Sequence, residues 1–297
     1  MKNKTLIAHL AVLIVNLIYS GNYFIAKGIM PTYLSPNFFI LLRIGGAFSL
    51  FWIIKFFIKE TIHKKDYWRI ALCGLFGISM NQLLFFQGLS ITSAVDASII
   101  MTSTPILVSI FSFLILKNPF TINKVVGITL GLAGAIYLIV LGSKETTTES
   151  SLLGNLLVLG NASSYSVYLV LVKPLMSKYK PITVITWVFS FGLLYTLPFG
   201  LAAFDESSFN FGWDIVLGII YVVLFTTFFA YLLNIYGLSI LPPTAVSAYI
   251  YLQPVFAMII GIIIAYNQDT ATGITFEKMA ATLLIFVGVY LVGRSRR

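Results

Sequence analysis

The side chains best suited to bind a small solute are amides, hydroxyls and phenols that lie inside long apolar stretches. An amide offers hydrogen-bond donors and an acceptor, so a group of them could bind a zwitterion or a polyol. Polar side chains are costly in hydrocarbon and usually face a partner or a water-filled cavity. We expect a cavity lined by Asn22, Asn81, Thr102, Tyr168, Tyr231, Asn234, Tyr249 and Gln253. Hydrogen bonds that only join helices would explain many of these residues equally well.

Two prolines follow polar residues at the same helical spacing. Thr102 precedes Pro105 by three residues, and Tyr251 precedes Pro254 by three. A proline inside a helix removes a backbone hydrogen bond, which a membrane tolerates only where protein or cavity water satisfies the freed carbonyl. We therefore expect Pro105 and Pro254 to be hinges in the cavity wall. The alternative is an ordinary kinked span.

Two charged residues near the ends of apolar runs could take part in binding. Arg43 lies seven residues into its run, about 10 Å deep at 1.5 Å per residue. It could extend to lipid headgroups, hold an anionic group of a solute, or pair with Asp96. Asp96 could cap the helix that follows it. If Asp96 titrates instead, it could couple transport to protons.

The chain offers few residues for catalysis. It has one cysteine, Cys73, and two histidines, His9 and His63. It contains neither an H-E-x-x-H motif nor a G-x-x-x-x-G-K-[ST] phosphate loop, the patterns of zinc proteases and of P-loop nucleotide binding. We expect no enzyme activity, no metal and no cofactor.

The candidate residues lie within continuous apolar runs. The composition is 59% apolar and 10% charged, with a mean hydropathy of +0.96, whereas soluble domains carry roughly 25% charged residues. Most runs approach the roughly 20 residues that a helix needs to cross a bilayer. We predict an all-α integral membrane protein with ten transmembrane helices, at about 6–26, 36–56, 70–89, 94–116, 125–142, 152–172, 182–203, 213–236, 244–265 and 279–293.

The charged residues between the runs predict the orientation in the membrane. The net charge is +9. With a cytoplasmic N-terminus, the basic clusters at 55–69, 173–180 and 294–297 all lie on the cytoplasmic side. This asymmetry follows the positive-inside rule and predicts a multi-pass protein of the plasma (bacterial inner) membrane with both termini in the cytoplasm. The basic surplus is thus a topology signal, and we expect no nucleic-acid partner.

The sequence resembles itself after a shift of about half its length. A shift of 149 places GLSI at 88–91 on GLSI at 237–240, and Pro105 on Pro254. Shifts of 146 and 154 align further residues near the ends of the halves. We predict two five-helix repeats, 1–143 and 144–297. Because five is odd, the second repeat enters the membrane from the opposite side, an inverted topology typical of secondary transporters.

Four motifs carry a resemblance to a known family. They are GLSITSAVDASIIMTSTP at 88–105, GLSILPPTAVSAYIYLQP at 237–254, LLRIGGAF at 41–48 and GITLGLAG at 127–134. In these features the whole chain resembles the EamA family of the drug/metabolite transporter superfamily. One departure is that Phe189 and Ser190 stand where the pattern of the second helix suggests an arginine.

The resemblance implies a secondary transporter, because similar proteins export amino acids and related metabolites. The expected activity is export of small polar metabolites by alternating access of two inverted halves. The expected partners are a small-molecule solute and the lipid bilayer, and a monomer would suffice. Since the cavity is neutral apart from Arg43, we expect neutral, zwitterionic or singly anionic solutes. A channel, or an intramembrane enzyme acting on a lipid-soluble substrate, is the alternative.

Overall fold

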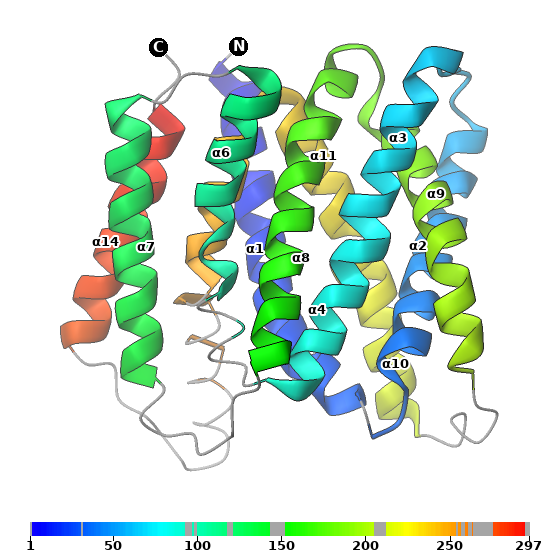
Figure 1. Ribbon diagram of the computed structural model, residues 1–297, viewed down its shortest axis with the longest axis horizontal. Helices are drawn as coiled ribbons and strands as arrows, with labels where there is room; N and C mark the ends of the chain where they lie inside the picture. The colour runs from blue at the N-terminus through cyan, green and yellow to red at the C-terminus, as the bar shows by residue number, and fades with distance from the viewer. Residues whose placement is uncertain are drawn as a thin grey trace.

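The regular structure is helical throughout the described part of the chain. The computed structural model describes residues 2–30, 32–92, 97, 100–117, 121–142, 152–204, 212–253, 255–256, 259–260, 263 and 276–294. The helices stand side by side in one bundle, and α1 begins at the same end of the bundle at which α14 ends (Figure 1). The elements up to residue 142 are α1 (Lys2–Ile29), α2 (Pro36–Phe56), η1 (Lys64–Asp66), α3 (Tyr67–Gly74), η2 (Leu75–Ser79), α4 (Met80–Ile91), α6 (Thr104–Leu116) and α7 (Ile122–Gly142).

The remaining elements begin at residue 152. They are α8 (Leu152–Val172), η4 (Lys173–Ser177), α9 (Pro181–Ala202), α10 (Trp213–Tyr221), η6 (Val222–Phe229), α11 (Ala230–Ile240), α12 (Pro243–Ala248), η7 (Tyr249–Leu252) and α14 (Phe276–Arg294). In Figure 1, α1 and α8 run in opposite directions along the bundle, and so do α2 and α9, and α7 and α14.

Six helical segments in the described ranges are long and apolar enough to cross a membrane. They are Asn3–Ala26, Pro36–Phe56, Lys64–Ile91, Leu152–Ser177, Pro181–Ala202 and Trp213–Ile240. Shorter apolar helices cover Thr104–Leu116, Ile122–Gly134 and Leu283–Val292. These segments support the predicted all-α, multi-pass membrane protein. The count of ten crossings and the inverted repeat stay predictions.

Two of the long segments contain a π-helical stretch at corresponding places. η2 separates α3 from α4, and η6 separates α10 from α11. A shift of 149 places residues 75–79 on 224–228, inside η6. Such wide turns are rare and occur frequently at functional sites. Each stretch leads directly into a helix that carries cavity residues, α4 and α11.

Aromatic packing joins α2, α9 and η6. The Phe51 ring lies 4.9 Å from Phe189 and 4.8 Å from Phe228, between ring centroids. Gly77 makes room for the Tyr168 ring, since a Cβ at Gly77 would lie 2.3 Å from Tyr168 Cδ2. Because crowding a close-packed interior is costly, this contact fixes how α8 packs against η2.

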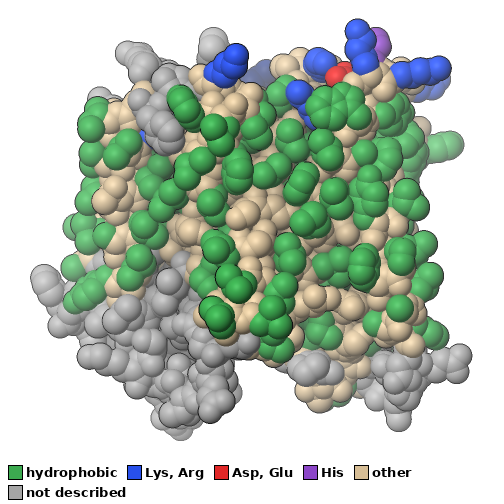
Figure 2. Space-filling model, viewed as in Figure 1, with side chains coloured by type: hydrophobic (Ala, Val, Ile, Leu, Met, Phe, Trp, Pro, Cys, Tyr) green, Lys and Arg blue, Asp and Glu red, His purple; other side chains and the backbone are tan. Residues whose placement is uncertain are grey.

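The outer surface suits a lipid environment. Large apolar side chains are exposed along the helices, for example Leu6, Ile14 and Leu217, and hydrophobic side chains cover the flank seen in Figure 2. Soluble monomers rarely expose apolar patches beyond a few hundred Å². The Lys and Arg side chains coloured in Figure 2 gather at the end of the bundle where α1 begins. The described basic residues are thus concentrated at one end.

An ion pair at that end joins η1, which precedes α3, to the segment that precedes α9. Lys178 Nζ donates to both carboxylate oxygens of Asp66, at 2.9 and 3.1 Å, and Tyr179 donates its hydroxyl to Asp66 at 2.7 Å. Burial of the ring and the bond to Asp66 raise the pKa of Tyr179 above its ordinary value of 10.0. The hydroxyl therefore remains a donor at neutral pH.

Candidate solute-binding cavity

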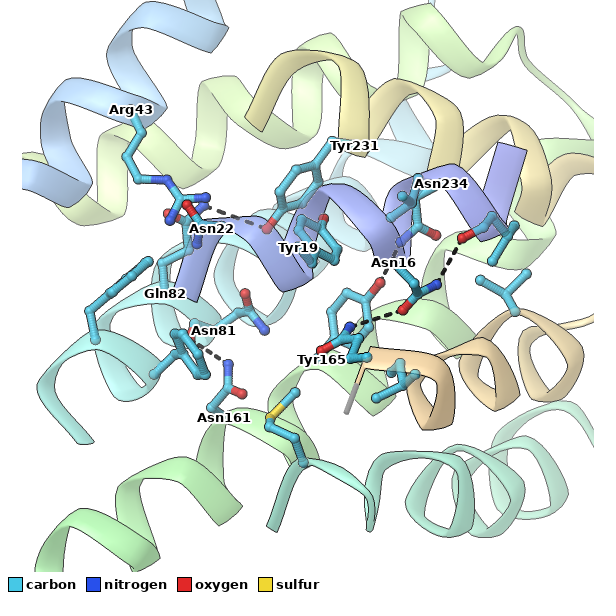
Figure 3. A pocket seen from close by; sticks show the side chains of 18 residues that line it. Asn16, Tyr19, Asn22, Arg43, Asn81, Gln82, Asn161, Tyr165, Tyr231 and Asn234 are labelled. Carbon is cyan, nitrogen blue, oxygen red and sulfur yellow. Dashed lines mark hydrogen bonds between the residues drawn. The ribbon is translucent and has the colours of Figure 1, made fainter. Parts of the chain in front are cut away.

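A polar cavity lies between the helices (Figure 3), and its lining comes both from residues 12–101 and from residues 161–253. Its volume is about 100 Å³. At least roughly 10–15 Å³ is needed to hold one water molecule, so the cavity has room for several. The lining residues are Val12, Val15, Asn16, Tyr19, Asn22, Arg43, Asn81, Gln82, Phe85, Phe86, Met101, Asn161, Tyr165, Tyr231, Asn234, Val246, Ile250 and Gln253. The space fits a small metabolite.

Arg43 of α2 brings a positive charge into the cavity. Its side chain is buried, and its Nε donates to Thr227 Oγ1 of η6 at 3.2 Å. The guanidinium carbon lies 4.9 Å from the centre of the Phe86 ring and 5.9 Å from that of Phe39. Cations over aromatic faces are attracted by the ring quadrupole. The two rings and Thr227 therefore hold the guanidinium in place at one end of the cavity.

Tyr231 of α11 links the π-helical segment η2 to the cavity. Its hydroxyl donates to the backbone carbonyl of Gly77 in η2 at 3.2 Å and accepts from Gln82 Nε2 at 3.5 Å. Its ring packs edge-on against Phe189, 5.1 Å away. These contacts tie the later part of the chain to α4 next to Arg43.

Two further amides are oriented by their donor groups. Asn161 of α8 donates to the backbone carbonyl of Asn81 at 2.6 Å. Asn234 of α11 donates to the Tyr165 hydroxyl at 2.5 Å. Both asparagines are buried, and the side-chain oxygen of each has no hydrogen-bond partner among the described residues. Their unpaired oxygens leave acceptor capacity for a bound solute.

The hydrogen-bonded amides of Gln253 and Asn16 close the end of the cavity away from Arg43. Gln253 Nε2 donates to Asn16 Oδ1 at 2.9 Å, and Asn16 Nδ2 donates to the Val12 carbonyl of its own helix at 2.8 Å. Ser20 Oγ donates to the Gln253 carbonyl at 3.2 Å. Figure 3 draws Arg43 at one side of the group of labelled residues and Asn16 with Asn234 at the other. The cavity thus has a cationic end and a neutral end.

Six of the nine predicted binding residues lie together in this lining. They are Asn22, Arg43, Asn81, Tyr231, Asn234 and Gln253. Five further polar residues, which are not among the nine predicted binding residues, lie beside them: Asn16, Tyr19, Gln82, Asn161 and Tyr165. Asn16, Tyr19 and Asn22 recur every three residues along α1, a helical spacing that marks one face. This spacing could have identified Asn16 as a further cavity residue.

The other three predicted residues lie outside the lining for local reasons. Tyr168 is fully buried against Gly77, so its ring serves packing. The Tyr249 hydroxyl lies 2.8 Å from His9 Nδ1 and so joins η7 to α1. Thr102 is buried in the turn that precedes α6. Tyr168, Tyr249 and Thr102 therefore make structural contacts rather than face the cavity.

The predicted hinge and coupling residues have a mixed outcome. Pro105 lies in the first turn of α6, not inside a continuous helix, which corrects the expectation that it breaks a backbone hydrogen bond there. At that position a missing N–H costs nothing, because the first turn has no intrahelical partners for its donors. Pro254 and Asp96 lie outside the described residues. The pairing of Arg43 with Asp96 therefore stays a prediction.

Metal-ligand clusters are absent from the described residues, where no three His, Cys, Asp or Glu side chains lie together. Cys73 is buried and free. The lining instead consists of amides, phenols, one guanidinium and apolar side chains. Such a set can bind a solute through hydrogen bonds and charge. Together with the apolar exterior, this geometry is that of a multi-pass membrane protein with an internal cavity.

The chain belongs to the EamA-like transporter family, which it matches twice, at residues 6–140 and 152–294. An uncharacterized transporter of Archaeoglobus fulgidus is 28% identical over 96% of this chain and 98% of its own length. The uncharacterized transporter YetK of Bacillus subtilis is 28% identical over 78% of this chain and 70% of its own. A WAT1-related protein of Arabidopsis thaliana is 27% identical over 96% and 84%. These names are consistent with a protein that is not an enzyme.

A solved structure has the same fold. It aligns with a TM-score of 0.75 over 96% of this chain and 95% of its own, at 17% identity. At this identity the likeness concerns the fold alone.

Proposed function

We propose that this protein is a secondary transporter that exports small polar metabolites, such as amino acids or related solutes, by alternating access of two inverted halves. The halves are residues 1–143 and 144–297. The observation that carries this proposal is the polar cavity inside an apolar bundle, because its lining comes from both halves. Residues such as Asn22 and Asn81 belong to the first half, and Asn161, Asn234 and Gln253 to the second.

Three structural features support the inverted arrangement. The π-helical stretches η2 and η6 correspond under the same shift of 149 that aligns the GLSI motifs. Elements at corresponding places, such as α1 and α8, run in opposite directions (Figure 1). The family also matches the chain in two consecutive segments. Two halves of opposite orientation can exchange shapes and so open a central site to either side in turn.

The location is proposed from the placement of charge. Described basic side chains gather at the end of the bundle where α1 begins (Figure 2). The positive-inside rule supports a cytoplasmic location for this end, and the proposed location is therefore the plasma (bacterial inner) membrane with both termini in the cytoplasm. One chain supplies both halves, so a monomer would suffice for transport.

The test is counterflow in proteoliposomes that hold the purified full chain. Vesicles are loaded with unlabelled solute pools, and uptake of the matching labelled amino acids, hydroxy acids, sugars and nucleosides is measured. We expect transient accumulation of at least one compound, and a loss of roughly tenfold or more in Asn234→Leu, which removes a cavity amide. Asn123→Leu makes the same change at an exposed position of α7 and should retain the flux.

Two results would contradict the proposal. Flux that is not stimulated by internal solute would indicate a channel, since only a carrier exchanges solute through one alternating site. Equal loss in Asn234→Leu and Asn123→Leu would remove the cavity from the transport path. Export is tested in the same vesicles by loading labelled solute inside and following its loss from chains of known orientation.

A further inference from the structure

The charge in the cavity is unbalanced among the described residues. Among the described lining residues, Arg43 is charged and no aspartate or glutamate is present. The described part of the chain contains the ion pair between Lys178 and Asp66, and none at Arg43. A buried charge without an opposite charge is costly unless hydrogen bonds and a counter-ion compensate it. An anionic group of a bound solute would supply that counter-ion.

The guanidinium is held so that part of it stays available. Nε is used by the bond to Thr227, and the guanidinium carbon lies over the rings of Phe86 and Phe39. The structure assigns no hydrogen bond from the two terminal amino groups to a described residue. A carboxylate can accept from a guanidinium in a bidentate manner, with two parallel bonds. The free edge of Arg43 is therefore suited to one carboxylate.

Four amides of the cavity lining have acceptors to spare. The side-chain oxygens of Asn22, Gln82, Asn161 and Asn234 are buried without partners among the described residues. The orientation of the Asn161 amide is fixed, because its nitrogen donates to the Asn81 carbonyl, which can only accept. Buried polar atoms that stay unpaired cost free energy. A solute with hydrogen-bond donors would satisfy these oxygens.

Part of the lining is apolar. Val12, Val15, Val246, Ile250 and Met101 contribute aliphatic or thioether surface. Such surface favours a short hydrocarbon chain over further polar groups. The volume of about 100 Å³ limits that chain to a few carbons.

We propose that the substrate class of this cavity is small monocarboxylates that carry a neutral hydrogen-bond donor, above all hydroxy acids with a short aliphatic chain. This inference rests on the proposed transport function. The carboxylate binds the terminal amino groups of Arg43, and the hydroxyl donates to the unpaired side-chain oxygen of Asn22, which lines the same cavity. The aliphatic chain lies against the apolar residues.

Net charge distinguishes monocarboxylates from zwitterions and dianions as substrates. One carboxylate neutralises Arg43, whereas a zwitterion adds an ammonium group for which the described lining offers no carboxylate. A dianion such as a phosphate ester brings a second negative charge without a second cation. In a site of low dielectric, each uncompensated charge weakens binding strongly.

The experiment compares four probes with one carbon skeleton. They are 2-hydroxyisocaproate, leucine, 2-hydroxyisocaproamide and isocaproate, which differ in net charge or in the hydroxyl. Binding to the purified full chain in detergent is measured by calorimetry, and counterflow is measured separately in proteoliposomes. We expect 2-hydroxyisocaproate to bind at least about tenfold more tightly than each of the other three.

Variants assign the preference to named groups. Arg43→Gln should abolish the advantage over the amide, and Arg43→Lys should retain part of it. Arg69→Gln removes a charge far from the cavity lining and should change nothing. Asn22 makes no hydrogen bond to a described residue, so Asn22→Leu leaves no protein partner unpaired. This variant should bind 2-hydroxyisocaproate and isocaproate equally, and it keeps the test decisive if Arg43→Gln does not fold.

The outcomes separate this inference from the transport proposal. Tighter binding of leucine or of the amide, an order unchanged in Arg43→Gln, or no binding of any probe would overturn the substrate class. Counterflow of another solute in that case leaves the transport function standing. Conversely, the expected order of binding without any counterflow supports the substrate class and contradicts transport.

Discussion

At the scale of single residues, the cavity depends on how a buried arginine is held. Arg43 has no carboxylate partner among the described residues, and a bond to Thr227 and two aromatic rings fix its position. Thr227 in turn donates to the Val222 carbonyl at 2.8 Å. One hydroxyl thus connects the charge to the π-helical stretch η6. Orientation of the guanidinium is therefore a property of both α2 and η6.

Thr227→Val tests this connection. Valine keeps the shape but removes the acceptor for Arg43 Nε, and a hydrogen bond to a charged group contributes about 1.5–3 kcal/mol. We expect binding of 2-hydroxyisocaproate to weaken by roughly tenfold or more, since about 1.4 kcal/mol is a factor of ten. The measurement is calorimetry on both proteins.

The matched control is Thr129→Val. Thr129 Oγ1 donates to a carbonyl of its own helix as well, but this residue is exposed on α7. An equal loss of affinity in the two variants, or no loss in Thr227→Val, would contradict the role given to Thr227.

At the scale of helices, close backbone contacts set the packing. α7 and α14 lie side by side and meet at glycines (Figure 1). A Cβ at Gly288 would lie 2.6 Å from the Gly127 carbonyl oxygen and 2.6 Å from the Gly131 nitrogen. Because these atoms belong to the backbone, they cannot move aside as a flexible side chain could. The glycines therefore allow an approach that any larger residue prevents.

Gly288→Ala should destabilise the protein through this contact. Overpacking typically costs about 1–3 kcal/mol, so we expect a lower Tm in a thermal unfolding assay in detergent. Gly45→Ala is the control, because a Cβ at Gly45 meets nothing within 4 Å and alanine is the better helix former. Its Tm should be unchanged or higher. A Tm of Gly288→Ala at or above that of the parent chain would rule out the close contact.

The helices themselves were largely predictable from the sequence, and their internal breaks were not. Long apolar runs demand helices, because a bilayer offers no other partner for the backbone. The π-helical stretches leave no comparable mark, since Leu75–Ser79 and Val222–Phe229 read as ordinary apolar helix. The polar side chains of Asn81 and Asn234 indicated that these residues line a cavity. Nothing in the sequence indicated that Tyr168 would instead be buried by packing on Gly77. Contacts between distant segments decide which polar residue faces the cavity.

At the scale of the whole molecule, the proposed topology requires the end of the bundle where α1 begins to be cytoplasmic. Lys64 is exposed at the end where α1 begins, and Asp214 is exposed at the opposite end (Figure 1). Cys73 is buried, so an introduced cysteine can be labelled selectively. The two positions therefore report the orientation independently.

Labelling of intact cells with an impermeant maleimide should modify Asp214→Cys. Lys64→Cys should react only after the membrane is opened. The parent chain controls for Cys73 and should not react. The reverse pattern would invert the proposed topology, and labelling of both positions in intact cells would contradict a single orientation.

The central claim is that the cavity is reached from both sides of the membrane in turn. Met101 lines the cavity, so Met101→Cys in a Cys73→Ala background places one thiol there. The most direct measurement is its reaction with a small impermeant thiosulfonate, added outside or inside to proteoliposomes of known orientation. We predict modification from either side, and slower modification when a counterflow substrate is present. Reaction from one side alone would contradict alternating access and leave a pocket that opens to that side only.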